Sequence, residues 1–524
     1  MPRSPDDWRL GAAIAALIAI IGIAAANHHI AGIYHDDGIY LASARSIAED
    51  GSYRLIGVPG APLATKYPPL YPLVLAAVWR VAPDFPDNLA LLKAVNALLL
   101  AGIGLLAYLW TGRLDYRSQI FRTAVALMTA FSPGLFWFSD MALSEPLFVL
   151  LLMGMLVVAA ERSDSAAGRS GQHLLWLGVL GALASLTRTI GVAAIAAATW
   201  HIWRRDGWRK AAIVLTPGLV ATGAWIAWCA LAAPQGGYLL DYYLKYEPSV
   251  WSRFRDAPML GIRMLALNVR YYALVAPEGL GLAGWALTAL AAVLTTIGVL
   301  PPANRRRLSL ALTLGMFYLA LLLGHPLPIE RYLAPLIPIV VAAAGLGVTW
   351  LMVERVAGPL AVLCLMPFLA TDVLWLRQFH HVTARHIHGH GGRPLPFSWP
   401  GFAGAIDWLA KNATPKTAIA SANDTLYFLY TEHPGVRPWP ARPELYSPAY
   451  GVRESGPDGA RIGGELRRLG VEYLVVGPML QDGEGKFARD AIAAVLAQND
   501  DEWAEVYRSS DGRHAIYRRG RSKP

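Results

Sequence analysis

Two adjacent carboxylates, Asp36 and Asp37, are the first side chains along the chain whose type and spacing suit catalysis. A carboxylate accepts a proton as a general base or ligates a divalent metal ion. The residues after them predict a short amphipathic helix that Asp37 caps, that runs to about Glu49 and that Gly51 closes. The alternative interpretation of the pair is a solvated helix cap without a catalytic role.

A lysine in a stiff setting follows in the same stretch. Lys66 stands directly before Tyr67-Pro68-Pro69, and the two prolines restrict the backbone around it. A lysine fixed near a membrane surface is suited to contact a phosphate group. The alternative is a lysine whose stem lies along apolar surface while its charge reaches water.

Two further acidic residues occur in the segment SDMALSEPLF. Asp140 is the second residue of this segment, and Glu145 stands before the proline that opens the next apolar run. Proline is well placed at the start of a helix, so Glu145 is a second candidate for acid–base chemistry. Its alternative role is to cap that helix.

Two arginines interrupt apolar sequence in similar positions. Arg188 lies between two threonines in the middle of a long apolar stretch, and Arg331 follows Glu330 at the start of another. A buried arginine in membrane sequence is costly and is usually functional. For the second position, the alternative is a local pair of Glu330 with Arg331.

Together these residues predict one catalytic site. The candidates are three catalytic carboxylates and three phosphate-binding cations: Asp36, Asp37 and Glu145, and Lys66, Arg188 and Arg331. Such a set suits an anionic, lipid-borne substrate, because a carboxylate takes a proton from an acceptor hydroxyl while cations stabilise a phosphate leaving group.

The elements that position these residues must be membrane helices. Of 524 residues, 55% are apolar and 16% charged, and the mean hydropathy is +0.37. Soluble domains carry about 25% charged residues, so an ordinary cytosolic enzyme is excluded. The two cysteines, Cys229 and Cys364, lie in apolar runs and form no metal or disulfide framework. The net charge is +9, and the basic residues lie in short clusters between apolar runs. This distribution is typical of membrane proteins and argues against a nucleic-acid partner.

Eleven apolar runs predict an all-α polytopic protein with about eleven transmembrane helices. They are 10–26, 89–112, 120–138, 146–160, 173–187, 189–203, 211–232, 282–300, 308–323, 332–352 and 357–376. The first is interpreted as an uncleaved anchor, with a cleaved signal peptide as the alternative. Residues 70–82 are apolar but short, and we interpret them as an interfacial segment.

Basic clusters set the predicted orientation. With the N-terminus inside, the inner connections are 1–9, 113–119, 161–172, 204–210, 301–307 and 353–356, and they hold the basic clusters. The outer loop 27–88 then carries the carboxylate pair and Lys66. Two short helices that meet near the outer face at 187–189 keep both flanking clusters inside and bring Arg188 to that face.

The composition changes after residue 376. We therefore divide the chain into a membrane domain, 1–376, and a soluble α/β domain, 377–524, outside the cytoplasm. Helices are expected near 402–412, 461–469 and 487–497, and strands near 417–421, 471–476, 502–508 and 513–518. A His-rich run at 380–390 is a weak, compositional hint of metal binding, and no metal-ligating residue is assigned.

These motifs, in this order, resemble those of the C-type glycosyltransferases (GT-C). The pattern is Asp-Asp in the first outer loop, then KYPPLYP, LSEPLF, LTRTIG and ERYLAPLIP. It is most similar to the group that contains protein O-mannosyltransferases and lipid A aminoarabinose transferases, glycosyltransferase families 39 and 83. The resemblance covers about residues 10–376. The Trp-Trp-Asp-Tyr-Gly motif of oligosaccharyltransferases does not occur in the sequence.

The resemblance implies a GT-C architecture and an inverting enzyme that moves one sugar from a polyprenyl phosphate to an acceptor outside the cytoplasm. It implies that Asp36 is the catalytic acidic residue, Asp37 the second of the pair and Glu145 the acidic residue of the second loop. Lys66, Arg188 and Arg331 would contact the prenyl phosphate. The implied partners are the lipid-linked donor, a glycan, lipid or protein acceptor and membrane lipid, in a bacterial inner membrane.

Some choices stay open at this point. A divalent metal ion beside Asp37 is an open question for the cofactor. The alternative function is a lipid or glycan transporter (a flippase). Transporters usually carry ionisable residues in the middle of their spans and show two related halves, whereas here the charges gather at one face.

Overall fold

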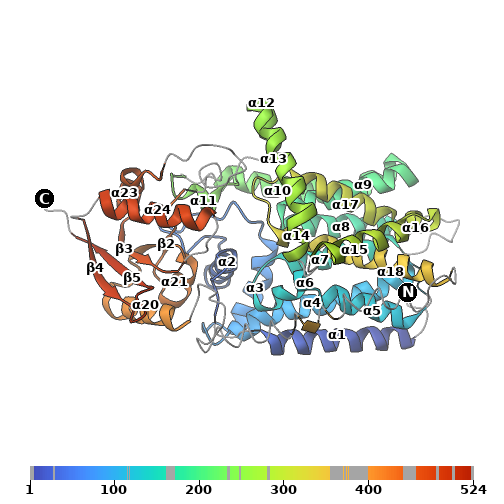
Figure 1. Cartoon of the computed structure of the whole chain (residues 1–524), viewed down its shortest axis with the longest axis horizontal. Coiled ribbons are helices and arrows are strands. Elements are labelled where there is room, and N and C mark those ends of the chain that lie inside the picture. The colour runs from blue at the N-terminus through green and yellow to red at the C-terminus, as the bar shows by residue number, and fades with distance from the viewer. Residues whose placement is uncertain are drawn as a thin grey trace.

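The long apolar runs form helices that pack into a bundle in the computed structural model, and a β-sheet region lies at one end of this bundle (Figure 1). The structure describes residues 5–26, 30–114, 116, 118–160, 171–232, 236–246, 250–279, 284–353, 370, 373–374, 376, 399–440, 456–478, 483–498 and 502–520.

The helices of the bundle correspond to the predicted apolar runs. They are α1 (Pro5–Ala25), α4 (Leu89–Arg113), α5 (Gln119–Phe131), α7 (Glu145–Ala159), α8 (Gly171–Thr187), α9 (Val192–Asp206), α10 (Trp208–Ala232), α15 (Gly284–Val299), α17 (Ser309–Leu323) and α18 (Ile337–Val353). Helix α4 is central, because it packs against α1, α5 and α7. The eleventh predicted run, 357–376, lies almost entirely outside the described residues.

Four of the described helices are long and apolar enough to cross a membrane: Asp7–Ala25, Leu89–Arg113, Trp208–Ala232 and Glu330–Leu351. A bent pair, Gln119–Phe131 with Pro133–Asp140, makes a fifth if it is counted as one span. These helices are those of a multi-pass membrane protein, and the number of spans stays a prediction.

The third predicted run, 120–138, is bent in the structure. Helix α5 ends at Phe131, and the chain turns by 53° into α6 (Pro133–Phe136) and the 3-10 helix η1 (Trp137–Asp140). Pro133 explains the break, since proline disfavours a helical conformation in the residue before it and lacks an N–H for the helix ladder.

The break predicted near Arg188 is present. Helix α8 ends at Thr187, η2 (Thr189–Gly191) follows, and α9 begins at Val192. Arg188 itself has an extended backbone, with φ −146° and ψ 136°, so its side chain leaves the chain between two helices.

Short helices connect the bundle. They are α11 (Asp241–Leu244), α12 (Val250–Asp256), α13 (Pro258–Arg270), the π-helix η3 (Tyr271–Val275), α14 (Ala276–Gly279), α16 (Pro302–Arg307) and the 3-10 helix η4 (Glu330–Leu336). The run at 70–82 forms α3 (Leu70–Val81), which packs against α2 (Asp36–Asp50).

Helix α2 ends as predicted and begins differently. Gly51 has the left-handed conformation, and its N–H donates to the carbonyl of Ile47. The residue at the N-cap position is His35, not Asp37, so the predicted cap is wrong. Asp37 is already inside the first turn, and its carboxylate reaches back to the N–H of Gly32 instead.

The C-terminal region contains a mixed five-stranded sheet of order β2-β1-β3-β5-β4. Its strands are β1 (Ala418–Ser421), β2 (Gly435–Val436), β3 (Val471–Val476), β4 (Trp503–Arg508) and β5 (Ala515–Arg519). Strand β1 pairs in parallel with β2 and β3, whereas β5 pairs antiparallel with β3 and β4. The helices are α20 (Trp399–Asn412), α21 (Asp424–Thr431), α23 (Gly459–Arg468) and α24 (Gly483–Gln498).

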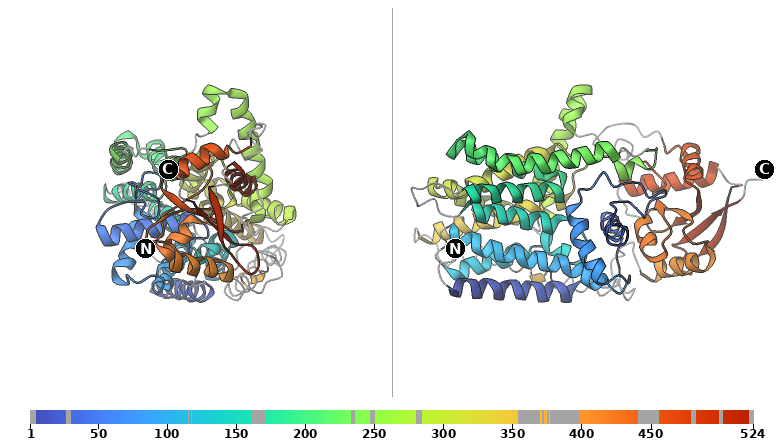
Figure 2. Two further views of the ribbon diagram at one scale, coloured as in Figure 1. Left: turned by 90° about the vertical axis from the view of Figure 1, so that its left-hand side faces the viewer. Right: turned by 180° about the vertical axis from the view of Figure 1, so that it is seen from behind.

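Each face of the sheet packs against two helices, because successive strand side chains point to opposite sides. Ile419 and Tyr473 pack with α20 and α21 on one face. Ala420 and Leu474 pack with α23 and α24 on the other face. This second apolar cluster also includes Ile39 of α2, and Figures 1 and 2 show α2 lying between the bundle and the sheet.

Candidate active site

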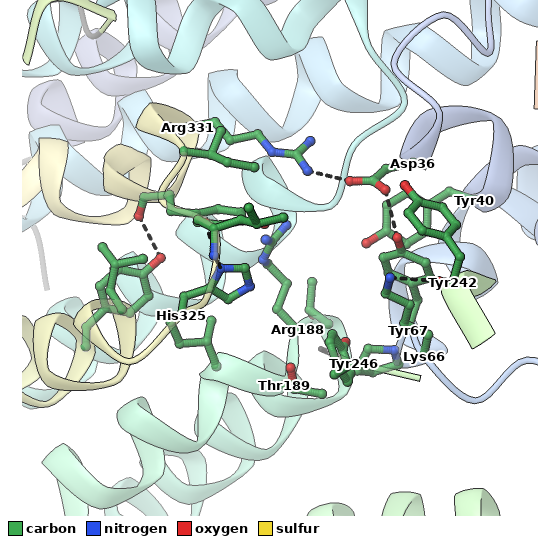
Figure 3. Close-up of a pocket in the computed structure, with 18 of the residues that line it drawn as sticks. Asp36, Tyr40, Lys66, Tyr67, Arg188, Thr189, Tyr242, Tyr246, His325 and Arg331 are labelled. Carbon is green, nitrogen blue, oxygen red and sulfur yellow. Dashed lines mark hydrogen bonds and ion pairs between the residues drawn. The ribbon is translucent and has the colours of Figure 1, made fainter. Parts of the chain in front are cut away.

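A cavity of about 240 Å³ lies where the start of α2, the break between α8 and α9, and η4 meet. Four of the six predicted site residues line it: Asp36, Lys66, Arg188 and Arg331. They come from four separate parts of the chain, and Figure 3 shows them around one space. The fold therefore brings a carboxylate and three cations together.

Asp36 is the carboxylate that faces the two arginines of this cavity. Tyr67 donates a hydrogen bond of 2.7 Å from its hydroxyl to Oδ1, and Arg331 donates to Oδ2. Figure 3 shows the two partners reaching Asp36 from different sides. Burial disfavours the charged form of Asp36, but the charge of Arg331 and the hydrogen bonds from Arg331 and Tyr67 act together against burial, and the pKa of this carboxyl lies well below its ordinary value. Asp36 is therefore ionised at neutral pH.

Glu145 lies behind the cavity and links the two arginines. It is the first residue of α7 and is 1% exposed. Its Oε1 lies 2.7 Å from a terminal guanidinium nitrogen of Arg188 and 3.7 Å from Nε of Arg331. Because one carboxylate holds both arginines, Glu145 acts here as their counter-ion rather than as a cavity-lining acid.

Arg188 has a second contact that fixes its direction. It donates a hydrogen bond of 3.1 Å to the hydroxyl oxygen of Ser144, the residue before Glu145. The Ser144 hydroxyl also lies 3.0 Å from that of Tyr40 in α2. The start of α7 therefore anchors Arg188 to the helix that carries Asp36.

Lys66 lies at the other side of the cavity and is 7% exposed. Its Nζ donates a hydrogen bond of 2.8 Å to the carbonyl of Tyr242. The same nitrogen lies 4.6 Å from the centroid of the Tyr242 ring. Tyr242 thus holds Lys66 through both its backbone carbonyl and its aromatic ring.

Asp37 is not a cavity residue, which corrects its predicted place in the site. It is 3% exposed, and its carboxylate accepts hydrogen bonds of 2.9 Å from the N–H groups of Gly32 and Gly38. Burial raises its pKa to about 6, against the lowering effect of those bonds. The side chain therefore holds the loop before α2, since both oxygens are bound to backbone.

The local pairing of Glu330 with Arg331 is not found. Glu330 accepts a hydrogen bond of 2.5 Å from Tyr271, whereas Arg331 turns to Asp36 and Glu145. Asp140 forms an ion pair of 3.0 Å with Lys93 and does not line the cavity.

Within the described part of the chain, no group of three or more His, Cys, Asp or Glu side chains is arranged to hold a metal ion. The pair Asp36 and Asp37 points in two directions, so these two carboxylates do not converge on one ion. The predicted His-rich run, 380–390, lies outside the described residues.

Sequence reasoning missed the aromatic and acidic walls of the cavity. Tyr67 donates a hydrogen bond to Asp36. Its place in the Lys-Tyr-Pro-Pro motif, next to Lys66, is the sequence signal that could have indicated it. Tyr242 and Tyr246 come from α11 and the residues after it, and Glu484 comes from α24 of the sheet region. Only the fold shows that Glu484 lines the cavity, because nothing in its local sequence indicates this.

Comparisons with known proteins identify the fold. No model of a known protein family matches the chain, and no curated protein sequence matches it. Solved structures do match. The crystal structure of ArnT from Cupriavidus metallidurans bound to undecaprenyl phosphate has a TM-score of 0.55 and 15% identity, over 99% of this chain and 99% of that chain.

A second solved structure is similar over the same length. The archaeal oligosaccharyltransferase AglB from Archaeoglobus fulgidus, in complex with an inhibitory peptide and a dolichol-phosphate, has a TM-score of 0.54 and 10% identity. The match covers 99% of this chain and 75% of that chain. The chain therefore has the fold of the C-type membrane glycosyltransferases, as the resemblance in its motifs predicted.

Proposed function

We propose that this protein is an inverting glycosyltransferase that moves a single sugar from a polyprenyl-phosphate donor to an acceptor outside the cytoplasm. The observation that carries the proposal is the shared cavity of Asp36 with Lys66, Arg188 and Arg331. One ionised carboxylate beside three cations matches the needs of a reaction in which a proton leaves the acceptor and a phosphate leaves the donor.

The cations are suited to the phosphate. Arginine binds phosphate oxygens in a fork geometry, and lysine acts as a point charge. Three cations face Asp36 and Glu145, and the third nearby carboxylate, Glu484, pairs with Arg437 at 3.1 Å. One positive charge is therefore left for an anionic group. The similar ArnT structure contains undecaprenyl phosphate, which supports a polyprenyl phosphate as the donor carrier.

The proposed reaction is a single displacement. Asp36 accepts the proton of the acceptor hydroxyl as its oxygen bonds to the anomeric carbon of the sugar. The bond from that carbon to the phosphate oxygen breaks, and its electron pair stays on the polyprenyl phosphate. Lys66, Arg188 and Arg331 stabilise the charge of this leaving group. Attack opposite the leaving group inverts the anomeric centre.

The partner of Asp36 influences its strength as a base. A carboxylate held by Arg331 has a low pKa and is a weak base. A phosphate that also binds Arg331 competes for the guanidinium and raises the pKa of Asp36. Donor binding therefore strengthens the base in the complex that reacts.

We place the cavity at the outer face of a bacterial inner membrane, with residues 377–524 as a soluble α/β domain outside the cytoplasm. The arginine-rich helix α16 and the N-terminus lie at the end of the bundle away from the sheet (Figure 1). Basic residues mark the cytoplasmic side of membrane proteins. This arrangement supports the predicted orientation.

The test is transfer by purified protein in lipid nanodiscs. We expect the wild type, supplied with a mixture of candidate acceptors, to release polyprenyl phosphate from one member of a panel of synthetic polyprenyl-phosphate sugars, measured by mass spectrometry. Asp36→Asn should still bind undecaprenyl phosphate but release none. The acceptor follows from adding candidate glycans, lipids or peptides and measuring their gain in mass.

The same assay separates the proposal from the transporter alternative. A flippase moves a lipid-linked sugar across a vesicle membrane without breaking the sugar–phosphate bond. Translocation with an intact donor, unaffected by Asp36→Asn, would contradict the proposal.

A further inference from the structure

The sheet region contacts the residue next to Asp36. His35 is the N-cap residue of α2 and is 5% exposed. Its backbone has φ 59° and ψ −60°, and residues other than glycine rarely adopt such a positive φ. No side-chain hydrogen bond caps the helix at this residue. Other contacts must therefore hold His35 in place.

Asp424 supplies such a contact from the far end of the chain. Its Oδ1 lies 3.1 Å from Nδ1 of His35, and Asp424 is fully buried. The hydroxyl of Tyr243 donates a hydrogen bond of 2.6 Å to Oδ2. Burial and the Arg437 guanidinium lower the pKa of His35, so its ring is neutral at pH 7. A carboxylate beside Nδ1 favours the tautomer with the proton on that nitrogen.

The start of α21 also holds the backbone on both sides of His35. Thr425, the residue after Asp424, donates a hydrogen bond of 3.2 Å to the carbonyl of Gly32. A Cβ atom added at Gly38 would lie 2.5 Å from Cβ of Thr425, so only glycine permits this approach. Helix α21 therefore holds the chain before and after His35.

The same network extends to the phosphate side of the cavity. The rings of Tyr242 and Tyr243 lie 5.0 Å and 5.7 Å from the ring of His35. The Tyr242 carbonyl accepts the hydrogen bond from Lys66. The segment that binds Asp424 thus also supports a predicted phosphate-binding residue.

We propose that Asp424 is a positioning residue for the reaction: through His35 it fixes the first turn of α2, and this sets Asp36 against Tyr67 and Arg331. The sheet region then contributes to the active site, because its helix α21 carries Asp424. The proposal rests on the proposed function in treating Asp36 as the base.

The first test compares kinetics of Asp424→Asn, His35→Asn and the double variant in nanodiscs. Asparagine tolerates a positive φ, such as that of residue 35, better than most residues. We expect kcat to fall about 100-fold, the cost of a misplacement near 1 Å, while KM for the donor changes little. Because the two residues act as a pair, the double variant should be no slower than either single variant.

A matched control separates positioning from general loss of stability. Asp7 and Arg122 form another buried ion pair, with a distance of 2.9 Å, at the start of α1 far from the cavity. Asp7→Asn should lower the melting temperature as much as Asp424→Asn but leave kcat per folded protein unchanged. Unchanged kcat in folded Asp424→Asn, or additive losses in the double variant, would overturn the inference.

The second test needs no substrate. A cryo-electron microscopy structure of Asp424→Asn in nanodiscs should show the first turn of α2 displaced and the hydrogen bond from Tyr67 to Asp36 lost. If the wild type transfers no sugar but this displacement occurs, the proposed function fails and the positioning role stands. If Asp36 keeps its place in the variant, the positioning role fails while the proposed function stands.

Discussion

The carboxylate of Asp36 and the guanidinium of Arg331 are in direct contact, although 295 positions separate them in the chain. One is the first residue of α2 and the other lies in η4, which leads into α18. The contact joins the proposed base to a proposed phosphate-binding residue, so the two functions share one charge pair.

Loss of the carboxylate at position 36 should abolish turnover. Asp36→Asn keeps the shape but removes the basic oxygen, and we expect turnover to fall by about two to four powers of ten. Donor affinity should not fall, since the three cations remain and Asp36 no longer competes for Arg331. Asp37→Asn is the comparison variant and should retain more turnover per folded protein than Asp36→Asn, because Asp37 lies outside the cavity and binds only the backbone of Gly32 and Gly38. Near-normal transfer by Asp36→Asn, with Asp37→Asn inactive, would move the base by one residue.

The arginines should govern donor binding. Hydrogen bonds to charged groups contribute about 1.5–3 kcal/mol, so Arg188→Ala and Arg331→Ala should each weaken undecaprenyl phosphate binding by roughly 10- to 100-fold. Binding is measured by microscale thermophoresis in nanodiscs, with melting temperature as a check on folding. Arg209→Ala, in an exposed cluster far from the cavity, is the control. Unchanged binding in both cavity variants would favour a purely structural ion-pair role.

The acid side of the pH profile should depend on Arg331. Asp36 acts as a base only when ionised, and Arg331 holds its pKa well below the ordinary value against burial. In Arg331→Gln this lowering is lost while burial remains, so the pKa of Asp36 rises. We expect the acid limb of kcat/KM to move to higher pH than in the wild type. A limb at the same pH in both proteins would show that the pair does not set the titration of Asp36.

The buried Asp37 should make stability depend on pH. Its pKa is raised from 3.8 to about 6 in the folded protein. Between these values the folded state binds the proton more tightly, so stability falls as pH rises, by about 3 kcal/mol in all. The melting temperature of the wild type should therefore drop from pH 4 to pH 7 more than that of Asp37→Asn, whose side chain does not titrate. Parallel curves for the two proteins would contradict this.

Topology offers a test of the proposed orientation. A reporter that is active only in the cytoplasm, fused after Pro524, should stay inactive, because eleven spans place the C-terminal region outside. The same reporter inserted in the basic connection 204–210 should be active and serves as the control. A cytoplasmic signal at Pro524 would mean that the span count is wrong by one.

Local sequence predicted most of the bundle helices and most of the strands of this protein. Apolar runs predict the bundle helices because hydrophobicity is a property of each run by itself. In a bilayer such a run forms a helix, since a helix satisfies all of its backbone N–H and C=O groups internally. Gly51 predicts the end of α2 for an equally local reason, its freedom to adopt a left-handed conformation. The strands β1, β3, β4 and β5 also fall where alternating apolar residues indicate them.

Tertiary structure alone decided which charges meet. Asp36 and Asp37 are neighbours with the same chemistry, yet one lines the cavity and the other binds the backbone of Gly32 and Gly38. The pair of His35 with Asp424 spans most of the chain, and neither residue carries a local signal for it. Secondary structure depends on neighbours in sequence, whereas an active site depends on which side chains the packed helices and sheet leave facing one space.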